Sequence, residues 1–204
     1  MIRRAPLKVY ALTSFAVLTL AACGQPKPAE KAEAPTAPAA APVESAPANP
    51  NLLTAEGIGP IRVGQTIGEV QAISGAPETP IASPDECNIF HPSRAPAGVF
   101  VMTEMGRVSR VTLRDGSTAK TDKGFGVGAD ASAIKSTYGG GVIVQPAKYD
   151  PAPAQDLFVW AKGGSTSYVT DPDARGVRYE VGTDGKVKAV HAGGPSIQLA
   201  ESCG

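Results

Sequence analysis

The sequence is poor in the residues on which metal centres and membrane spans depend. It holds three cysteines, two histidines and one tryptophan in 204 residues. Cys87 and Cys203 lie far apart, and no histidine stands at ligand spacing from them, so no zinc pattern is present. The apolar run at residues 9–20 would span about 18 Å as a helix, against about 30 Å for a bilayer core. We therefore expect no metal, no cofactor and no helix that remains in a membrane.

The first 22 residues have the pattern of a secretion signal, because three basic residues precede the apolar run. The run ends in Leu-Ala-Ala-Cys at residues 20–23, which resembles the lipobox of bacterial lipoproteins. The resemblance implies cleavage before Cys23 and acylation of Cys23 with chains such as palmitate. Gly24 follows instead of an aspartate, which favours the outer membrane, with the domain facing the periplasm. The alternative is a signal without lipid and a chance cysteine at the cleavage site.

The charge of the mature chain argues against nucleic-acid binding. Loss of residues 1–22 removes three of the 19 basic residues and none of the 19 acidic ones, leaving a net charge of about −3. No basic stripe remains that could pair with phosphates. The membrane, reached through the lipid on Cys23, and a protein are the partners that we expect.

Residues 23–50 are expected to form a tether behind the lipidated cysteine. Sixteen of the 27 residues from 24 to 50 are alanine or proline, and the segment has little apolar bulk to bury. Such a composition favours an extended, disordered chain of at most about 80 Å. The folded part is then residues 51–204.

Cys87 and Cys203 form an even pair once Cys23 is acylated. In an oxidising compartment such a pair is expected to form a structural disulfide. Closing this loop would contribute about 4 to 5 kcal/mol in the chain-entropy model. Two free thiols or a metal site are the alternatives.

Residues 51–204 contain two similar stretches. Val-Gly-Gln-Thr at residues 63–66 aligns with Val-Gly-Ala-Asp at residues 127–130, at a spacing of 64. Each stretch predicts a short helix with Thr66 or Asp130 as N-cap and a glycine at the C-terminal end. Apolar residues at helical spacing predict that each helix packs one face on a sheet, in the sets Ile67, Val70, Ile73 and Ala131, Ile134, Tyr138.

Three strands are predicted after each helix. Segments rich in β-branched and aromatic residues lie at residues 86–91, 98–104 and 107–114, and at 156–162, 176–182 and 186–191. Met-Gly at residues 105–106 and Asp-Gly at residues 184–185 are suited to hairpin turns. The turns recur at a spacing of 79, so the second unit holds about fifteen extra residues.

A helix followed by a three-stranded antiparallel meander, repeated, resembles the SmpA/OmlA outer-membrane lipoproteins and the two-repeat β-lactamase inhibitor proteins. The resemblance implies an α+β fold of two tandem units, about residues 57–116 and 121–192, which form one sheet with the helices packed on one face. In Val-Gly-Gln-Thr the family usually has Met where this chain has Gln65. No inhibitory residue can be aligned, so none is carried over.

Catalytic signatures are scarce. His91 and His191 end predicted strands, so a histidine base would have to be one of them. No nucleophile elbow or Ser-x-x-Lys motif is present. The glycine-rich residues 124–128 match neither phosphate-binding fingerprint and are interpreted as a structural turn. We expect no enzyme activity and no catalytic residues.

Aromatic residues are weak candidates for ligand binding. Phe158 and Trp160 lie two apart on one strand, with Tyr179 expected on a neighbouring strand, where the three rings could meet a sugar or a protein. We give more weight to the view that they pack under the helices. Tyr149 and Tyr168, in the extra loops, are the more exposed candidates.

The preferred function is that of a non-catalytic envelope lipoprotein with a periplasm-facing protein-binding module, acting in assembly or envelope maintenance. This rests on the absence of catalytic signatures and on the resemblance. Inhibition of a hydrolase such as a β-lactamase, lysozyme or protease, and binding of a glycan or the cell wall, are the alternatives.

Overall fold

Seven strands form the main antiparallel sheet of the computed structural model, which describes Asn49 and residues 51–203. The expected signal peptide, the lipidated Cys23 and most of the expected tether lie outside the described residues. The strands follow the spatial order β4 (Asn88–Phe90), β5 (Val99–Glu104), β6 (Arg107–Leu113), β11 (Val187–Gly193), β10 (Arg175–Val181), β9 (Gln155–Lys162) and β8 (Ile143–Pro146). The fold is mixed α+β and consists mostly of strands.

The six predicted strands are all present in this sheet, with ends within two residues of those expected. The centre is the pairing of β6 with β11, where Thr112 stands opposite His191. β8 was not predicted, because its four residues, ending in Pro146, show too little alternation to stand out from the loop.

A second sheet corrects the expectation of a single one. It has the order β3-β2-β1-β7, from β3 (Ile61–Arg62), β2 (Gly57–Ile58), β1 (Leu52–Thr54) and β7 (Lys120–Thr121). β1 runs parallel to β7, whereas the other pairs are antiparallel. Strands of two or three residues carry almost no periodic signal, and this parallel pair joins segments almost 70 residues apart, so sequence pattern could not reveal the sheet.

Helix α1 (Ile67–Ser74) begins as predicted with a capping box. The Thr66 hydroxyl accepts from the Glu69 amide at 3.2 Å, and the Glu69 carboxylate accepts from the Thr66 amide at 2.7 Å. Ile67 and Val70 are buried, but Ile73 is 42% exposed, so its expected place in the core is wrong. The eight-residue helix turns its last apolar residue toward solvent and buries Ser74 instead.

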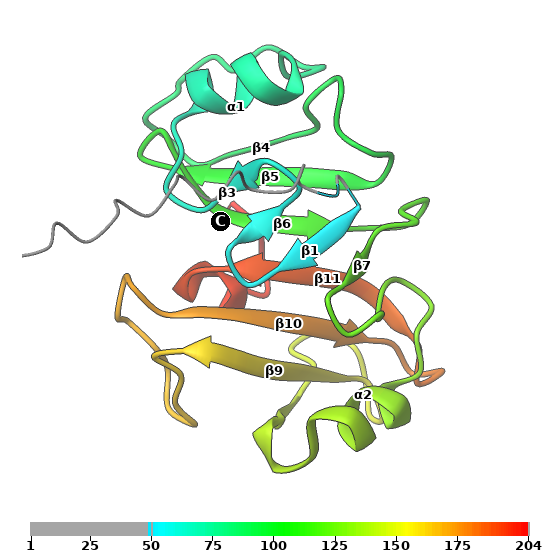
Figure 1. Ribbon diagram of the computed structural model, residues 1–204. Coiled ribbons are helices and arrows are strands. Elements are labelled where there is room, and N and C mark those ends of the chain that lie inside the picture. The colour runs from blue at the N-terminus through cyan, green and yellow to red at the C-terminus, as the bar shows by residue number, and fades with distance from the viewer. Residues whose placement is uncertain (1–48, 50, 204) are drawn as a thin grey trace, which may run out of the picture. The chain divides into compact units, whose positions relative to one another are not determined.

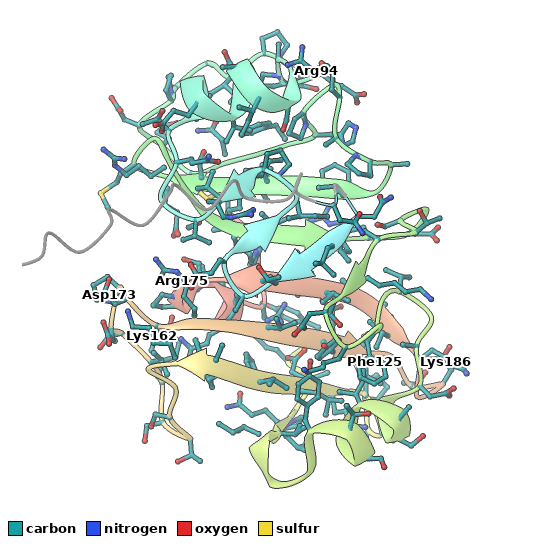
Figure 2. All side chains as sticks on the ribbon, viewed as in Figure 1. Arg94, Phe125, Lys162, Asp173, Arg175 and Lys186 are labelled. Atoms are coloured by element: carbon teal, nitrogen blue, oxygen red, sulfur yellow. A yellow bond between two sulfur atoms is a disulfide. The ribbon has the colours of Figure 1, made fainter. Side chains whose placement is uncertain are left out.

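Helix α2 (Ala131–Tyr138) buries Ala131 and Ile134 and follows Asp130, the predicted N-cap. The Asp130 side chain caps no amide within the described part of the chain. It accepts instead from Lys186 Nζ at 2.7 Å. Figure 2 labels Lys186 at the end of the β10–β11 hairpin, beside α2. The Asp130–Lys186 pair therefore joins the start of α2 to the β10–β11 hairpin.

Each helix is joined to a hairpin by the same backbone bonds. The backbone amide three residues before the first helical residue donates to a strand carbonyl. The amide of the first helical residue donates to the carbonyl of the glycine in the hairpin turn. The bonds are Gly64 N to Val108 O (2.7 Å) and Ile67 N to Gly106 O (3.2 Å) for α1, and Gly128 N to Val187 O (2.8 Å) and Ala131 N to Gly185 O (3.0 Å) for α2. The glycines before the helices thus enter a structural turn, as interpreted from the sequence.

The two faces of the main sheet have different coverings. In Figure 1, α1 and α2 lie at opposite ends of the sheet with the small sheet between them. Residues of both helices and the small sheet share one buried core with alternate residues of the main sheet, such as Val111, Val177 and Val190. The other face carries Arg110, Arg178 and other polar side chains. The C-terminal segment, residues 194–203, lies on this polar face.

The C-terminal segment starts at the end of β11 and contains the short helix η2 (Pro195–Gln198). Its end returns to the edge strand β4, where the Cα atoms of Cys203 and Cys87 lie 5.5 Å apart and the sulfur atoms are within bonding distance. The structure thus places the two cysteines as the disulfide prediction requires, and residues 196–203 cross from β11 to the β4 edge as expected.

Candidate functional site

A pocket of about 300 Å³ opens on the polar face of the main sheet, and we call it the charged pocket. One wall is the β8–β9 loop, which supplies residues 147–150, among them Lys148, Tyr149 and Asp150, and another contains Ala200 of the C-terminal segment. The sheet supplies the remaining residues, Asp156 of β9 with Arg178 and Glu180 of β10.

Strand alternation places the charged residues of β10 on this face. Val177, Tyr179 and Val181 belong to the apolar core, so Arg178 and Glu180 between them point to the opposite side. In the ladder of β10 with β9, Glu180 stands directly opposite Asp156. Two carboxylates and a guanidinium therefore meet on two neighbouring strands.

Arg178 lies at the bottom of the charged pocket, with 2% of its surface exposed. Its Nη1 donates to the carbonyl of Leu199 at 3.0 Å, and its Nη2 lies 3.6 Å from Glu180 Oε2. Nε lies 3.7 Å from Asp156 Oδ1, and neither atom has a hydrogen-bond partner among the described residues. Burial lowers the pKa of Arg178 and raises the pKa of Asp156, since both groups lose water.

Glu180 is held as a carboxylate by its neighbours. Its Oε2 lies 3.3 Å from His191 Nε2, and this hydrogen bond, with the nearby positive charge of Arg178, lowers the pKa of Glu180 to about 2. Burial lowers the pKa of His191 to about 3, so the imidazole is neutral at pH 7. An ionised Glu180 only accepts, so we assign the proton to His191 Nε2. Nδ1 then accepts from the Thr112 hydroxyl at 3.0 Å.

Two lysines complete the ion pairs around the pocket. Lys188 Nζ donates to Asp150 Oδ2 at 2.7 Å, and this bond raises the pKa of Lys188. Lys148 Nζ donates to Glu201 at 3.1 Å and lies 4.9 Å from the centre of the Tyr149 ring. Since Lys148 belongs to the loop and Glu201 to the C-terminal segment, this exposed pair joins the two walls.

Arg110, on β6, fixes the C-terminal segment to the sheet. Its Nη1 donates to the carbonyls of Ser196 and Leu199 at 3.1 and 3.2 Å, and its Nη2 donates to the Ser202 hydroxyl at 2.9 Å. Burial lowers the pKa of Arg110 to about 10, which leaves it charged at neutral pH. Because Arg178 donates to the same Leu199 carbonyl, residues from both halves of the sheet hold this segment.

The pocket is suited to binding a polar group. Its lining carries Lys148 and Arg178 against Asp150, Asp156 and Glu180, and Lys188 pairs with Asp150 from outside the pocket. No cysteine, serine or threonine lines it among the described residues. Within the same part of the chain no group of three acidic, histidine or cysteine residues could hold a metal ion, and no helix could span a membrane.

The aromatic candidates are not brought together. Tyr149, 64% exposed, lines the charged pocket, whereas Tyr168, 65% exposed, does not. Trp160 lies in a separate hollow with Lys162 and the β9–β10 loop. Tyr149 is therefore the one aromatic candidate that the charged pocket contains.

The expected grouping of Tyr179 with Phe158 and Trp160 is wrong. Tyr179 pairs with Leu157, so it points to the helical face, where its hydroxyl bonds Thr121 at 3.3 Å. Phe158 and Trp160 lie on the polar face, so the view that they pack under the helices is also wrong. The cause is the register, because Phe158 stands opposite Arg178 and not opposite Tyr179.

On the helical face, Tyr179 belongs to an aromatic cluster with Tyr138 and Phe125. The hydroxyls of Tyr138 and Tyr179 lie 3.1 Å apart, and Phe125 stacks edge-on against Tyr179. Figure 2 labels Phe125 next to α2. The cluster packs the helix on the sheet and leaves the polar face to the charged residues.

The two histidines have separate environments. His91 Nδ1 donates to the Val99 carbonyl at 2.7 Å near the β4 edge. His191 lies in the centre of the sheet beside Glu180. The sequence interpretation missed Asp156, Arg178 and Glu180, although the alternation in residues 177–181 places Arg178 and Glu180 on a polar face.

Comparisons with known proteins place few constraints on this site. No family model and no curated protein matches the chain. A crystal structure of a DUF4309 family protein (YjgB) from Bacillus subtilis subsp. subtilis str. 168 is similar at a TM-score of 0.40 with 14% identity, over 67% of this chain and 84% of that chain. A similarity at this level assigns neither a family nor a function.

Proposed function

We propose that this chain is a non-catalytic envelope lipoprotein that binds a protein partner at the charged pocket. The lipid on Cys23 would anchor it, on the outer membrane facing the periplasm, and residues 23–50 would hold the domain away from the membrane. The signal pattern and the lipobox resemblance support the location. The charged pocket supports the binding role.

The observation that carries the proposal is the pair Arg178 Nε and Asp156 Oδ1. Both atoms are buried without a hydrogen-bond partner among the described residues. An unsatisfied buried polar group costs about 1–3 kcal/mol, so folded proteins satisfy most of them. The two atoms face each other at 3.7 Å as a loose ion pair, so a partner in the pocket would have to separate them to bond either one.

The scaffold of the site is, on our proposal, a tandem repeat of two helix and meander units. The match of residues 63–66 with 127–130 supports it, as do the equivalent bonds from Gly64 to Val108 and from Gly128 to Val187. β9 and β10 belong to the second unit, as do the extra residues 147–150 of the β8–β9 loop. The charged pocket is then a feature of the second unit, formed with the help of loop residues that the first unit lacks.

Glycan binding is a second candidate, and Tyr149 favours it. An exposed ring next to buried hydrogen-bonding groups also suits a sugar, whose ring stacks on an aromatic face while its hydroxyls bond polar side chains. The Trp160 hollow is a further aromatic surface. We rank this below protein binding because Lys148 Nζ already lies over the Tyr149 ring.

Cross-linked pull-downs with the tagged full-length chain test the proposal. Tyr149→Ala should reduce capture of a specific envelope protein several-fold, because this exposed ring lines the pocket. Tyr168→Ala is the matched control, since it removes an equally exposed tyrosine outside the pocket. Capture that both variants retain, or that both lose equally, would refute the pocket as the contact site.

A further inference from the structure

We propose that a groove at one end of the main sheet, which we call the Met105 groove, binds an extended segment of a partner protein that carries a carboxylate beside apolar side chains. The β5–β6 hairpin and residues 63–64 form one side of the groove, and the β9–β10 loop with residues 194–196 forms the other. The groove shares no lining residue with the charged pocket, so this inference does not rest on the proposed function.

Met105 is held in a backbone conformation that methionine rarely adopts. Among the described residues it is the one residue other than glycine with a positive φ, at 49°. With Gly106, at 73°, it forms the two-residue turn between Glu104 and Arg107. Turns with positive φ at both positions favour Asn-Gly or Asp-Gly. In the equivalent β10–β11 hairpin only Gly185 has a positive φ, so that turn avoids the strain.

The Met105 side chain gains little from folding that would offset this strain. It is 83% exposed, more than any other large apolar residue of the described chain. The groove beside it has a volume of about 980 Å³, part of it open to solvent, and Val63, Pro172 and Pro195 add apolar surface to its walls. A flexible, polarisable methionine adapts to many side-chain shapes. Strain together with exposed apolar surface at one residue is typical of a contact site.

The two charged residues that flank the turn do not neutralise each other. Glu104 and Arg107 stand directly opposite in the ladder of β5 with β6. Glu104 accepts from the Ser196 hydroxyl, whereas Arg107 Nη1 donates to the Gly64 carbonyl at 3.0 Å. The two side chains therefore bind opposite sides of the groove and leave the space between them open.

The remaining positive charge favours an acidic partner. The lining carries Arg107 and Arg175 against Glu104. Figure 2 labels Arg175 at the start of β10, and its Nε pairs with Glu56 at 3.3 Å. Arg107 is exposed and forms no ion pair with a described residue. Its guanidinium is thus the charge that a partner carboxylate can bind.

The shape of the groove suits one segment of chain. Loops border it on both sides, and its volume of about 980 Å³ is large enough for several side chains but narrow for a folded surface. An apolar side chain can pack between Met105 and the two prolines, while the neighbouring carboxylate reaches Arg107. The segment then combines apolar burial with one charge-assisted bond.

Binding of short peptides to the isotope-labelled full-length chain, followed by NMR, tests this inference. The probes are acetyl-Leu-X-Leu-amide with X as Glu, Gln or Lys, and acetyl-Ala-Glu-Ala-amide. We expect the Leu-Glu-Leu peptide to shift the amide signals of Gly64, Met105 and Ser196. It should bind about 2- to 5-fold more tightly than the Gln peptide at low salt, with no preference at high salt. Replacing both leucines by alanine should weaken binding several-fold.

Met105→Asn separates contact from structure. Asparagine tolerates a positive φ, so the variant should have a higher melting temperature than the native chain and yet bind the Leu-Glu-Leu peptide several-fold more weakly. A merely structural role would lower both together. Ile73→Asn is the matched control, because it removes another exposed apolar residue that does not line the groove, and it should leave binding unchanged.

Arg107→Gln tests the charge. Glutamine keeps a donor for the Gly64 carbonyl but is neutral. The variant should bind the Glu peptide only as tightly as the Gln peptide, while its affinity for the Gln peptide stays that of the native chain. A double-mutant cycle over the two peptides and the two proteins measures this coupling.

Several results would overturn the inference. Peptide shifts that lie outside the groove, or no shifts at all, would remove the site. Equal binding of the Glu, Gln and Lys peptides would remove the acidic partner, and native affinity in Met105→Asn would remove the role of methionine. A dimer that Met105→Asn dissociates in analytical ultracentrifugation would assign the groove to a second copy of the chain. The pull-down with Tyr149→Ala tests the charged pocket separately, so either proposal can fail without the other.

Discussion

Acid should destabilise the domain through His191. The imidazole is buried in the centre of the main sheet, and burial lowers its pKa to about 3. In the unfolded chain the pKa of a histidine is about 6.5. Because the folded pKa is the lower one, the unfolded chain binds the proton more readily between these values. The stability from His191 is therefore complete above pH 6.5 and is lost as the pH falls toward 3.

The size of this effect follows from the two pKa values. Each pH unit between them costs about 1.4 kcal/mol, so the free energy of unfolding should fall by about 3 kcal/mol from pH 6.5 to 4.5. Glu180, with its pKa lowered to about 2, loses its own contribution only below about pH 4.5, so this window leaves it out. Asp156, whose pKa is raised, contributes in the opposite direction as it takes up a proton.

A matched variant separates His191 from the carboxylates. His191→Gln keeps a donor for Glu180 and an acceptor for Thr112 but cannot be protonated. Denaturant unfolding of both proteins at pH 7.0, 5.5 and 4.5 should show a lower stability for the variant at pH 7, by about 1–2 kcal/mol. Its curve should be flatter by about 3 kcal/mol over the window. Equal slopes for the two proteins, or an NMR titration of His191 near pH 6.5, would refute the reasoning.

Three further predictions concern the disulfide, the core and the anchor. Cys203→Ser should lower the free energy of unfolding by several kcal/mol, up to about 5 in the chain-entropy model, and peptide mapping that finds both native thiols free would contradict the bond. Ile134→Ala should cost about 3 kcal/mol in denaturant unfolding, because that side chain is fully buried, while the exposed Ile73→Ala should cost less than about 1. Cys23→Ala should leave an unacylated, uncleaved precursor in mass spectra, and an unmodified Cys23 in the native protein would disprove lipidation.

The pattern of neighbouring residues was enough to predict the helices and strands in which apolar residues repeat with a helical or an alternating period. The capping box at Thr66 and the turn glycines Gly106 and Gly185 each act within a few residues, so the sequence alone predicts α1 and both hairpins. Pairing over long distances was harder. The parallel contact of β1 with β7 depends on the whole fold, and no nearby residue specifies it. The disulfide pairing could be predicted from the sequence because, with Cys23 assigned to the lipid, Cys87 and Cys203 were the only cysteines left to pair.

The candidate site was only partly predictable, for a physical reason. Alternation along β10 places Arg178 and Glu180 on one face, but an alternating strand normally turns such residues to water. Here the C-terminal segment covers them, and it binds the guanidiniums of Arg110 and Arg178 mostly through its carbonyls, with the Ser202 hydroxyl as a further acceptor for Arg110. Backbone carbonyls are present in every residue, so no sequence pattern marks this role. Tyr149 was found through its place in a long loop, without any indication of the charges beneath it.

The C-terminal segment also determines when the domain can be complete. The Arg110 guanidinium lies in the middle of the main sheet, yet its acceptors are Ser196, Leu199 and Ser202, which follow it by 86 to 92 residues. β6 likewise obtains its central neighbour from β11, which is made almost 80 residues later. A chain that emerges N-terminus first, from a ribosome or from a translocation channel, therefore cannot bury this charge until residues 196–202 have emerged. Removal of residues 197–204 should leave the sheet its strands but take from the Arg110 guanidinium its Leu199 and Ser202 acceptors.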